Sequence, residues 1–153
     1  MSYSNLCSGV VLYKVHTEKT NHTVARERCD QDSDDAANGD AAVSGFLYLP
    51  RPQSLAENSW YNSLSITNGN PDNVWTDITK TSNGWVYRDG SPGTWFNWNR
   101  NEPNGGNPGI SVAHIWPWQT WNDVTHTAEL KVICTFRLPA GAENTCPWLR
   151  DFE

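Results

Sequence analysis

The sequence predicts one α+β domain over residues 1–153, in which two helices come first and mostly strands follow. Capping residues precede apolar positions at helical spacing near Asn21 and near Ser54, as is typical of helix starts. Farther along, an Asn-Gly pair at residues 83–84 lies between two apolar segments and predicts a tight hairpin turn. A chain of this length suffices for a single domain that buries roughly two thirds of its unfolded surface.

The first strand and the first helix are predicted near the N-terminus. Residues 10–15 form an apolar run that suits a strand beside the C-terminal one. Asn21 can cap a helix that continues to about Asp32. The apolar face of this helix would comprise Val24, Ala25 and Cys29.

The second helix is predicted just after Pro52, where Ser54 and Glu57 form a capping-box pattern. The expected apolar stripe of this helix consists of Leu55, Tyr61 and Leu64. Residues 89–109 are rich in Gly, Pro and Asn, which predicts a long irregular loop. A loop of this length in a compact domain is usually functional.

An acidic stretch that is also rich in Ala and Gly covers residues 30–45, and we expect it to be a solvated insertion. Its alternating acids at 30, 32 and 34 suggest a calcium-binding EF-hand loop. However, Asp35 and Ala41 stand where that loop requires glycine and glutamate, so the EF-hand interpretation is rejected.

Composition excludes several classes of function. The net charge of −6 and the lack of a basic stripe argue against binding to nucleic acid or to an anionic membrane. No apolar stretch reaches the roughly 18 residues that span a bilayer, so no membrane insertion is expected. With 37% apolar residues but nine tryptophans, the core must rely on large aromatic side chains. No zinc-protease or serine-hydrolase motif is present, so we expect no enzyme activity.

Two short segments supply oxygen ligands. They are residues 102–104, with Glu102 and Asn104 around a proline, and residues 121–123, with Asn122 and Asp123 after a tryptophan. Calcium accepts six to eight such oxygens, and two vicinal sugar hydroxyls can fill positions that the protein leaves open. Glu102 would then accept a hydrogen bond from a hydroxyl while the Asn104 amide donates one. A cis bond before Pro103 would turn both side chains toward one point.

These segments resemble the C-type lectin domain, the calcium-dependent carbohydrate-recognition fold, in its EPN type. The similarity covers nearly the whole chain, with nine residues between residue 104 and His114, and ten between Asp123 and Cys134. Lectins of the EPN type usually select mannose, glucose, fucose or N-acetylglucosamine. Further matching positions are Ala25, Cys29, residues 74–78, Trp95, Trp98 and residues 132–134.

The resemblance implies a C-type lectin-like fold, with two helices packed on antiparallel sheets and a long irregular loop that binds calcium and sugar. It implies one calcium ion with ligands Glu102, Asn104, Asn122 and Asp123. Val124 corresponds to a position that touches the sugar ring, although ordinary strand packing is the alternative. Trp118, together with Trp116, could stack on a sugar or belong to the core.

Four cysteines, at positions 7, 29, 134 and 146, fit no zinc spacing and favour disulfides made in an oxidising compartment, so we expect a secreted protein. The N-terminus has no hydrophobic secretory signal, and we expect Met1 to begin a trimmed mature chain. The resemblance pairs Cys29 with Cys134. Cys7 and Cys146 would then tie the termini together, unless Cys146 bridges two copies.

Departures from the family pattern concern the calcium loop. The inner disulfide of the family falls on Val112 and His126, so this chain lacks it. The usual additional glutamate becomes Ile110, with Asn107 as a candidate replacement. The acids of the auxiliary calcium site fall on Lys80, Gly105 and Ser111, so we expect no auxiliary site.

Two functions follow from these observations. The first is a calcium-dependent lectin for mannose-type or fucose-type glycans, with a homodimer as the default assembly because a single shallow site binds weakly. The second is a calcium-independent module of the same fold that binds a protein partner or a surface. Ile110, Lys80 and the missing inner disulfide motivate the second.

Overall fold

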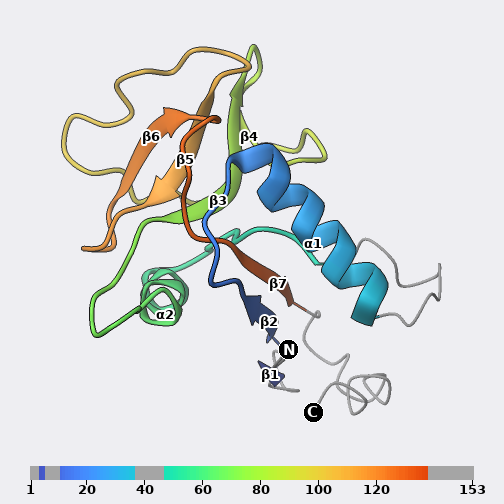
Figure 1. The fold of residues 1–153 in the computed structure, drawn as a ribbon. Helices are drawn as coiled ribbons and strands as arrows, with labels where there is room; N and C mark the ends of the chain where they lie inside the picture. The colour runs from blue at the N-terminus through green and yellow to red at the C-terminus, as the bar shows by residue number, and fades with distance from the viewer. Residues whose placement is uncertain (1–3, 6–10, 37–46, 138–153) are drawn as a thin grey trace.

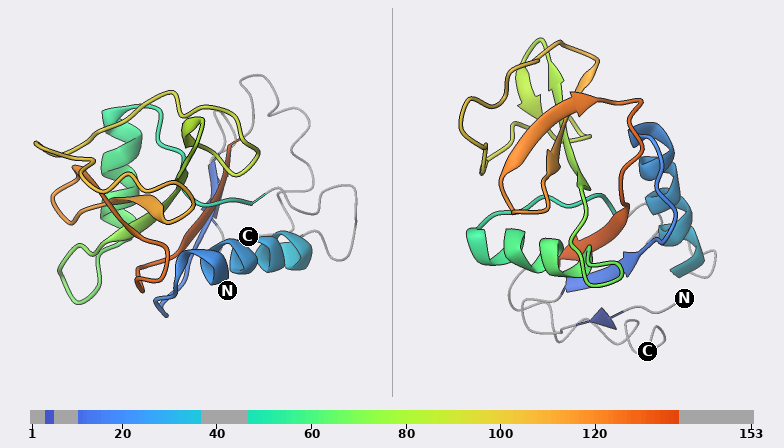
Figure 2. Two further views of the ribbon diagram at one scale, coloured as in Figure 1. Left: turned by 90° about the horizontal axis from the view of Figure 1, so that it is seen from above. Right: turned by 60° about the vertical axis from the view of Figure 1, so that its left-hand side comes forward.

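The computed structural model describes residues 4–5, 11–36 and 47–137. Two antiparallel sheets organise this part of the chain (Figures 1 and 2). One has the order β1 (Ser4–Asn5), β2 (Val11–Val15) and β7 (Ile133–Arg137). The other has the order β4 (Gly84–Val86), β3 (Val74–Thr81), β5 (Ser111–Ile115) and β6 (Trp121–Thr125). The predicted strand at residues 10–15 therefore pairs with the last described strand, as expected.

Helix α1 (His22–Ala36) lies beside β7 (Figure 1). The Asn21 side chain caps it by accepting a hydrogen bond from the Val24 backbone N–H at 2.9 Å. Ala25 and Cys29 are buried, and Cys29 forms a disulfide with Cys134 that has an S–S distance of 2.06 Å. The pairing implied by the family resemblance is thus present. Cys7 and Cys146 lie outside the described residues.

The prediction of a solvated segment at residues 30–45 was wrong for its first part, because α1 continues to Ala36. Asp32 is buried. Its carboxylate accepts a hydrogen bond from Lys14 Nζ at 2.9 Å and contacts His16 Nε2 at 2.6 Å. Paired charges allow an acidic residue to occupy an interior helix face. Ser33 is also buried and accepts a hydrogen bond from the Leu47 N–H at 2.8 Å. Residues 37–45 lie outside the described residues.

Helix α2 (Leu55–Leu64) begins as the capping pattern predicted, with Ser54 Oγ accepting from the Glu57 N–H at 3.1 Å. Its buried face was only partly predicted. Tyr61 is buried, but Leu55 is 59% exposed, and Asn58 and Asn62 are buried in place of an apolar stripe. Their side-chain amides donate hydrogen bonds to backbone carbonyls of the turn between β5 and β6. This face of the helix therefore packs through hydrogen bonds.

The hairpin between β3 and β4 is shifted by one residue from its prediction. Thr81 pairs with Gly84, so residues 82–83 form the turn and Gly84, at φ +103°, begins β4. Glycine is favoured at such a positive φ.

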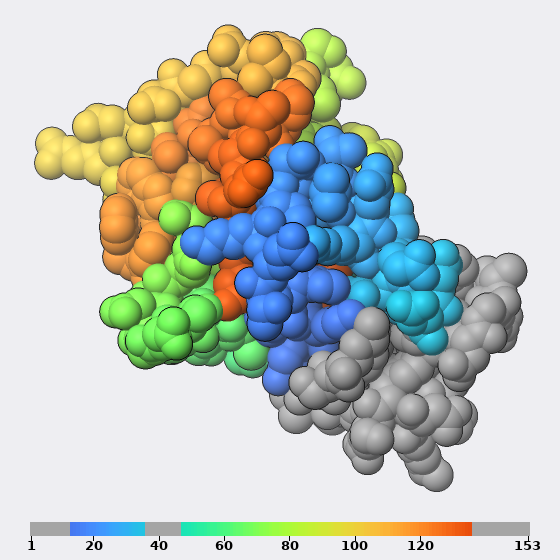
Figure 3. Space-filling model, in the orientation of Figure 1, coloured from blue at the N-terminus to red at the C-terminus, as the bar shows by residue number. Residues whose placement is uncertain are grey.

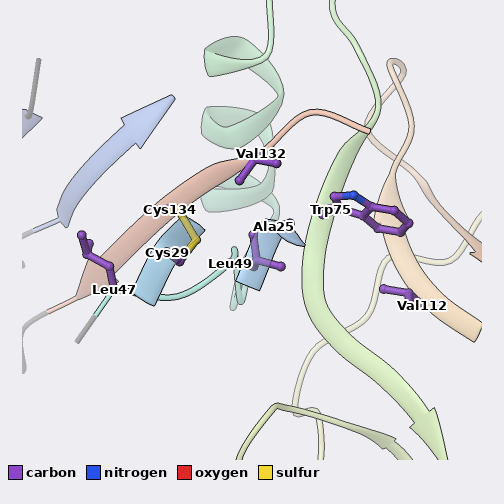
Figure 4. Close-up of a cluster of buried hydrophobic side chains, with 8 residues drawn as sticks. All are labelled: Ala25, Cys29, Leu47, Leu49, Trp75, Val112, Val132 and Cys134. Carbon is purple, nitrogen blue, oxygen red and sulfur yellow. A yellow bond between two sulfur atoms is a disulfide. The ribbon is translucent and has the colours of Figure 1, made fainter. Parts of the chain in front are cut away.

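The core consists of two clusters of buried side chains. The first surrounds the disulfide and includes Trp75 and Val112 (Figure 4). The second includes Trp121 and has partly buried Trp85, Trp95 and Trp98 packed against it. Trp95 and Trp98 belong to the long segment between β4 and β5, which contains no helix or strand and forms a protruding edge of the molecule (yellow in Figure 3). The predicted irregular loop is therefore present and rests on an aromatic base.

Candidate functional site

The long loop is fixed to the start of β6 through aromatic and backbone contacts. The Trp121 N–H donates to Asn97 O at 2.8 Å, and the Asn99 N–H donates to Trp121 O at 2.9 Å. The Trp98 and Trp121 rings meet edge to face with centroids 5.8 Å apart. Such edge contacts are favourable for aromatic pairs. The segment that precedes residue 102 is thus tied to the strand that carries Asn122 and Asp123.

Trp121 is in turn positioned by α2. Its ring is fully buried, and its Nε1–H donates to Asn58 Oδ1 at 2.7 Å. The Asn58 amide donates to Gln119 O at 2.7 Å. Asn58 therefore satisfies both a buried indole and a turn carbonyl, and the sequence prediction missed it because a polar residue on a helix face is usually assigned to solvent.

Glu102 and Asn104 meet directly. The Glu102–Pro103 peptide bond is cis. The Asn104 side-chain amide donates to Glu102 Oε1 at 3.1 Å, and the Asn104 backbone N–H donates to Glu102 Oε2 at 3.1 Å. Glu102 is partly buried and Asn104 is exposed, so both present oxygen atoms at the molecular surface.

Asp123 joins this pair from β6. Its carboxylate accepts backbone N–H bonds from Asn104 at 3.0 Å, Gly105 at 2.9 Å and Gly106 at 3.0 Å. Its residue exposure is only 8%. Three charge-assisted hydrogen bonds to consecutive amides fold the loop around one carboxylate. This cradle holds the loop in the absence of the inner disulfide that the family pattern would place at residues 112 and 126.

The electrostatics of the site follow from two neighbouring carboxyl groups. Burial and the nearby Asp123 raise the pKa of Glu102. Burial also acts to raise the pKa of Asp123, but the N–H groups of Gly106, Asn104 and Gly105 outweigh it and lower that pKa. The N–H groups thus favour the ionised form of Asp123, and the charge on Asp123 opposes ionisation of Glu102. A cation at this point would relieve the repulsion between the two groups.

Asn122 is placed differently from the other three predicted ligands. Successive side chains on a strand point to opposite faces, and the Asn122 side-chain amide contacts His114 Nε2 at 3.3 Å. Burial lowers the pKa of His114 to about 4, so its ring is neutral and can accept from the Asn122 amide. No hydrogen bond joins Asn122 to Glu102, Asn104 or Asp123 within the described residues. The structure thus brings Asn122 to His114 and not to the other three residues, and its role as a ligand stays a prediction.

The residues that depart from the family pattern lie beside this cradle. Ile110 is 45% exposed. Asn107 accepts the backbone N–H of Ile110 and of Ser111 through its backbone oxygen, at 3.1 Å each, and its own N–H donates to Ser111 Oγ at 3.0 Å. Asn107 thus closes a turn through its backbone, and its role as a replacement ligand stays a prediction.

Two further predicted sugar contacts have distinct surroundings. Trp118 is 62% exposed, and its ring lies 4.8 Å from that of the partly buried Trp116. An exposed indole of this kind is available for stacking. Val124 is partly buried and packs against the first core cluster, in keeping with the strand-packing alternative.

Comparison with known proteins identifies the family. The model of the lectin C-type domain matches residues 44–136, which is more than half of the chain. The chain therefore belongs to the C-type lectin domain family. Within the described residues, no helix is long and apolar enough to cross a membrane.

Individual relatives agree with this family. A mannose-binding isoform of C-type lectin from Oxyuranus scutellatus is 33% identical over 70 residues, covering 42% of this chain and 44% of that protein. Pulmonary surfactant-associated protein D from Bos taurus is 30% identical over 88 residues, covering 58% of this chain and 24% of that protein. The chain thus spans less than half the length of these curated relatives.

A solved structure supports the fold. The carbohydrate-recognition domain of the mouse scavenger receptor C-type lectin superposes with a TM-score of 0.67 at 21% identity, covering 90% of this chain and 96% of that chain. The predicted C-type lectin-like fold, with two helices and antiparallel sheets, is confirmed.

Proposed function

We propose that this chain is a calcium-dependent lectin that binds vicinal hydroxyls of mannose-type, fucose-type or N-acetylglucosamine-type glycans without catalysis. The observation that carries this proposal is the convergence of the Glu102 carboxylate and the Asn104 amide, on an exposed loop, with the Asp123 carboxylate of β6. Asn122 is the fourth proposed ligand, through its carbonyl oxygen. Residues 1–153 would form the single domain that carries this site.

The donor set fits calcium. Carboxylate and amide oxygens are its preferred ligands, and two carboxyl groups in one small site need a cation to offset their charge. A bound calcium ion would supply open coordination positions for two sugar hydroxyls. Beside it, Glu102 would accept a hydrogen bond from one hydroxyl, and the Asn104 amide would donate to the other. Trp118 would add stacking on an apolar sugar face, and Val124 a contact with the ring.

The environment and assembly follow from the same reasoning. A disulfide between Cys29 and Cys134 suits an oxidising compartment, which supports secretion. The mannose-binding name of the Oxyuranus scutellatus relative supports a mannose-type preference. A shallow site with few contacts gives weak binding, so useful avidity requires several sites on one assembly, with a homodimer as the smallest.

Two measurements test this function. Calorimetric titration with calcium should give one saturable site, and binding to a mannose array should disappear after chelation and return when calcium is restored. Asp123→Asn is the matched variant, since it keeps the shape of the side chain and removes the charge. Sugar binding that persists under chelation contradicts the proposal.

The second candidate is a calcium-independent binding module. The observation that favours it is the cradle itself, because three backbone N–H groups already satisfy Asp123. The exposed Ile110, in the place of a carboxylate ligand, also suits contact with a protein or another surface. Retention of partner binding under chelation, with no heat from calcium, would support this candidate.

A further inference from the structure

One hollow of the described structure reaches the start of β5, the strand that pairs with β6, which carries Asp123. It has a volume of about 280 Å³ and is bounded by the start of α1, the end of β3 and the start of β5, which lie side by side in Figure 1. This volume is just below the range of about 300–1,000 Å³ that is usual for small-molecule sites. The hollow therefore suits a small group and not a whole oligosaccharide.

Its lining is cationic. Arg26 and Lys80 both line it, together with hydroxyl groups such as those of Thr23 and Ser111, and none of the described lining residues is acidic. Hydroxyl and guanidinium N–H groups are hydrogen-bond donors that suit an oxyanion. A protein with a net charge of −6 has thus gathered two cationic side chains around one concave surface.

The two cations are incompletely neutralised. Arg26 donates to Asp77 Oδ1 through Nε at 3.2 Å, but the same carboxylate also pairs with Arg51 at 2.8 Å. One carboxylate therefore serves two guanidinium groups. Lys80 Nζ lies 5.7 Å from the centroid of the Trp85 ring and forms no ion pair within the described part of the chain. Positive charge remains available to a ligand.

Ser111 connects this hollow to the candidate site. Its Oγ accepts the Asn107 N–H at 3.0 Å, and this bond uses a lone pair of the oxygen and not the hydroxyl hydrogen. The same oxygen lies 3.5 Å from a Cβ built on Gly105, next to the Asp123 carboxylate. The two regions are therefore separated by one side chain at the start of β5.

We propose that this hollow binds an oxyanion, such as a sulfate ester or a carboxylate, that is carried by the glycan bound at the Glu102 and Asp123 site. This inference rests on the proposed lectin function for the identity of the carrier, but the hollow's affinity for an oxyanion is independent of calcium. The protein would then select acidic glycans over their neutral counterparts, with Lys80 and Arg26 as the charge-reading residues.

The first experiment uses inorganic sulfate as a probe of the full chain in calcium-free buffer at constant ionic strength. Backbone amide NMR signals of residues 79–81 and 109–112 should shift and saturate. Lys80→Gln, which breaks no ion pair, should weaken this binding at least about fivefold. Lys19→Gln is the matched control, because Lys19 pairs with Asp72 away from the hollow. Shifts that do not saturate, or equal losses in both variants, overturn the proposal.

The second experiment compares the same sugar in sulfated, uronate and neutral forms, in the presence of calcium. We expect the better acidic form to bind about tenfold more tightly than the neutral one, and Lys80→Gln to remove this difference while neutral-sugar binding is unchanged. Equal binding of all three forms contradicts the oxyanion inference alone. If no sugar binds with calcium, the lectin function fails, and the sulfate titration still decides whether the hollow accepts an oxyanion.

Discussion

Gly105 faces the Asp123 carboxylate so closely that a Cβ built on it would lie 2.5 Å from Asp123 Oδ2. The requirement for glycine here is steric, because the Gly105 backbone does not adopt a positive φ. The close approach lets the Gly105 and Gly106 N–H groups both reach the same carboxylate oxygen. The glycine-rich turn therefore serves the cradle and not only the flexibility of the loop.

Gly105→Ala should displace the Asp123 carboxylate and weaken calcium and sugar binding at least about tenfold, because a methyl group and the oxygen cannot occupy the same space. Calorimetric titration measures the loss. Gly106→Ala is the matched control: Gly106 has φ +64° and open space around its Cβ, so alanine costs about 1–2 kcal/mol of stability without meeting the carboxylate. Equal binding losses in the two variants would contradict the steric role.

Exchange of Glu102 and Asn104 for Gln and Asp should move sugar preference toward galactose, because the exchange reverses the order of acceptor and donor along the loop. A glycan array with calcium present measures the change. Glu129→Gln combined with Asn70→Asp is the control, since both positions are exposed and the net charge is equally unchanged. An unaltered sugar profile in the first variant would argue against direct contact.

Ile110→Glu should tighten calcium binding by about tenfold or more, because the resemblance places a carboxylate ligand at this position and added ligand charge raises calcium affinity. Ile110 is 45% exposed, so the substitution opens no cavity in the core. Ile110→Gln separates the effect of charge from that of removing an apolar side chain. Equal affinities for the Glu and Gln variants would show that Ile110 does not lie within reach of the ion.

More of the fold than of the candidate site could be predicted from the sequence. The predictions of the caps at Asn21 and Ser54 and of the irregular loop rest on local chemistry, and the prediction of the disulfide rests on the family pattern. The structure confirms all of them. The length of α1 was underestimated because the partners of Asp32 come from a distant part of the sequence, Lys14 in β2 and His16 just after it. The Asp123 cradle depends on backbone N–H groups, which every residue carries, so no side-chain pattern reveals it. The contact between Asn122 and His114 likewise depends on cross-strand register.

The free energy of unfolding should fall as the pH is lowered from 7 to 5, because two histidines are buried in the neutral form. Burial lowers the pKa of His22 to about 3 and that of His114 to about 4. The histidine pKa of the unfolded chain is about 6.5, so the unfolded chain binds more protons than the folded one in this pH window. Each histidine should therefore lower the free energy of unfolding by about 2 kcal/mol between pH 7 and pH 5. Urea unfolding at several pH values measures the slope.

His22→Gln should remove about half of that pH dependence, whatever its effect on stability at pH 7. The lowered carboxyl pKa values, such as that of Asp32, affect stability only at more acidic pH, since those groups contribute above their unfolded pKa and lose that contribution as the pH falls through the folded value. A slope that is unchanged in the variant would show that His22 is not the titrating group.

Asn58→Ala should destabilise the fold and weaken calcium binding at the proposed site together, because Asn58 links α2 to the strand that carries Asp123. The substitution leaves the buried Trp121 Nε1–H without its partner, at about 1–3 kcal/mol, and removes one of the two hydrogen bonds that the Gln119 carbonyl accepts, since the Asn97 amide still donates to it. Urea unfolding and a calcium titration measure the two effects. Asn70→Ala, at an exposed position, is the control. If Asn58→Ala lowers stability but leaves calcium affinity unchanged under folding conditions, then Asp123 is positioned by its amide cradle alone.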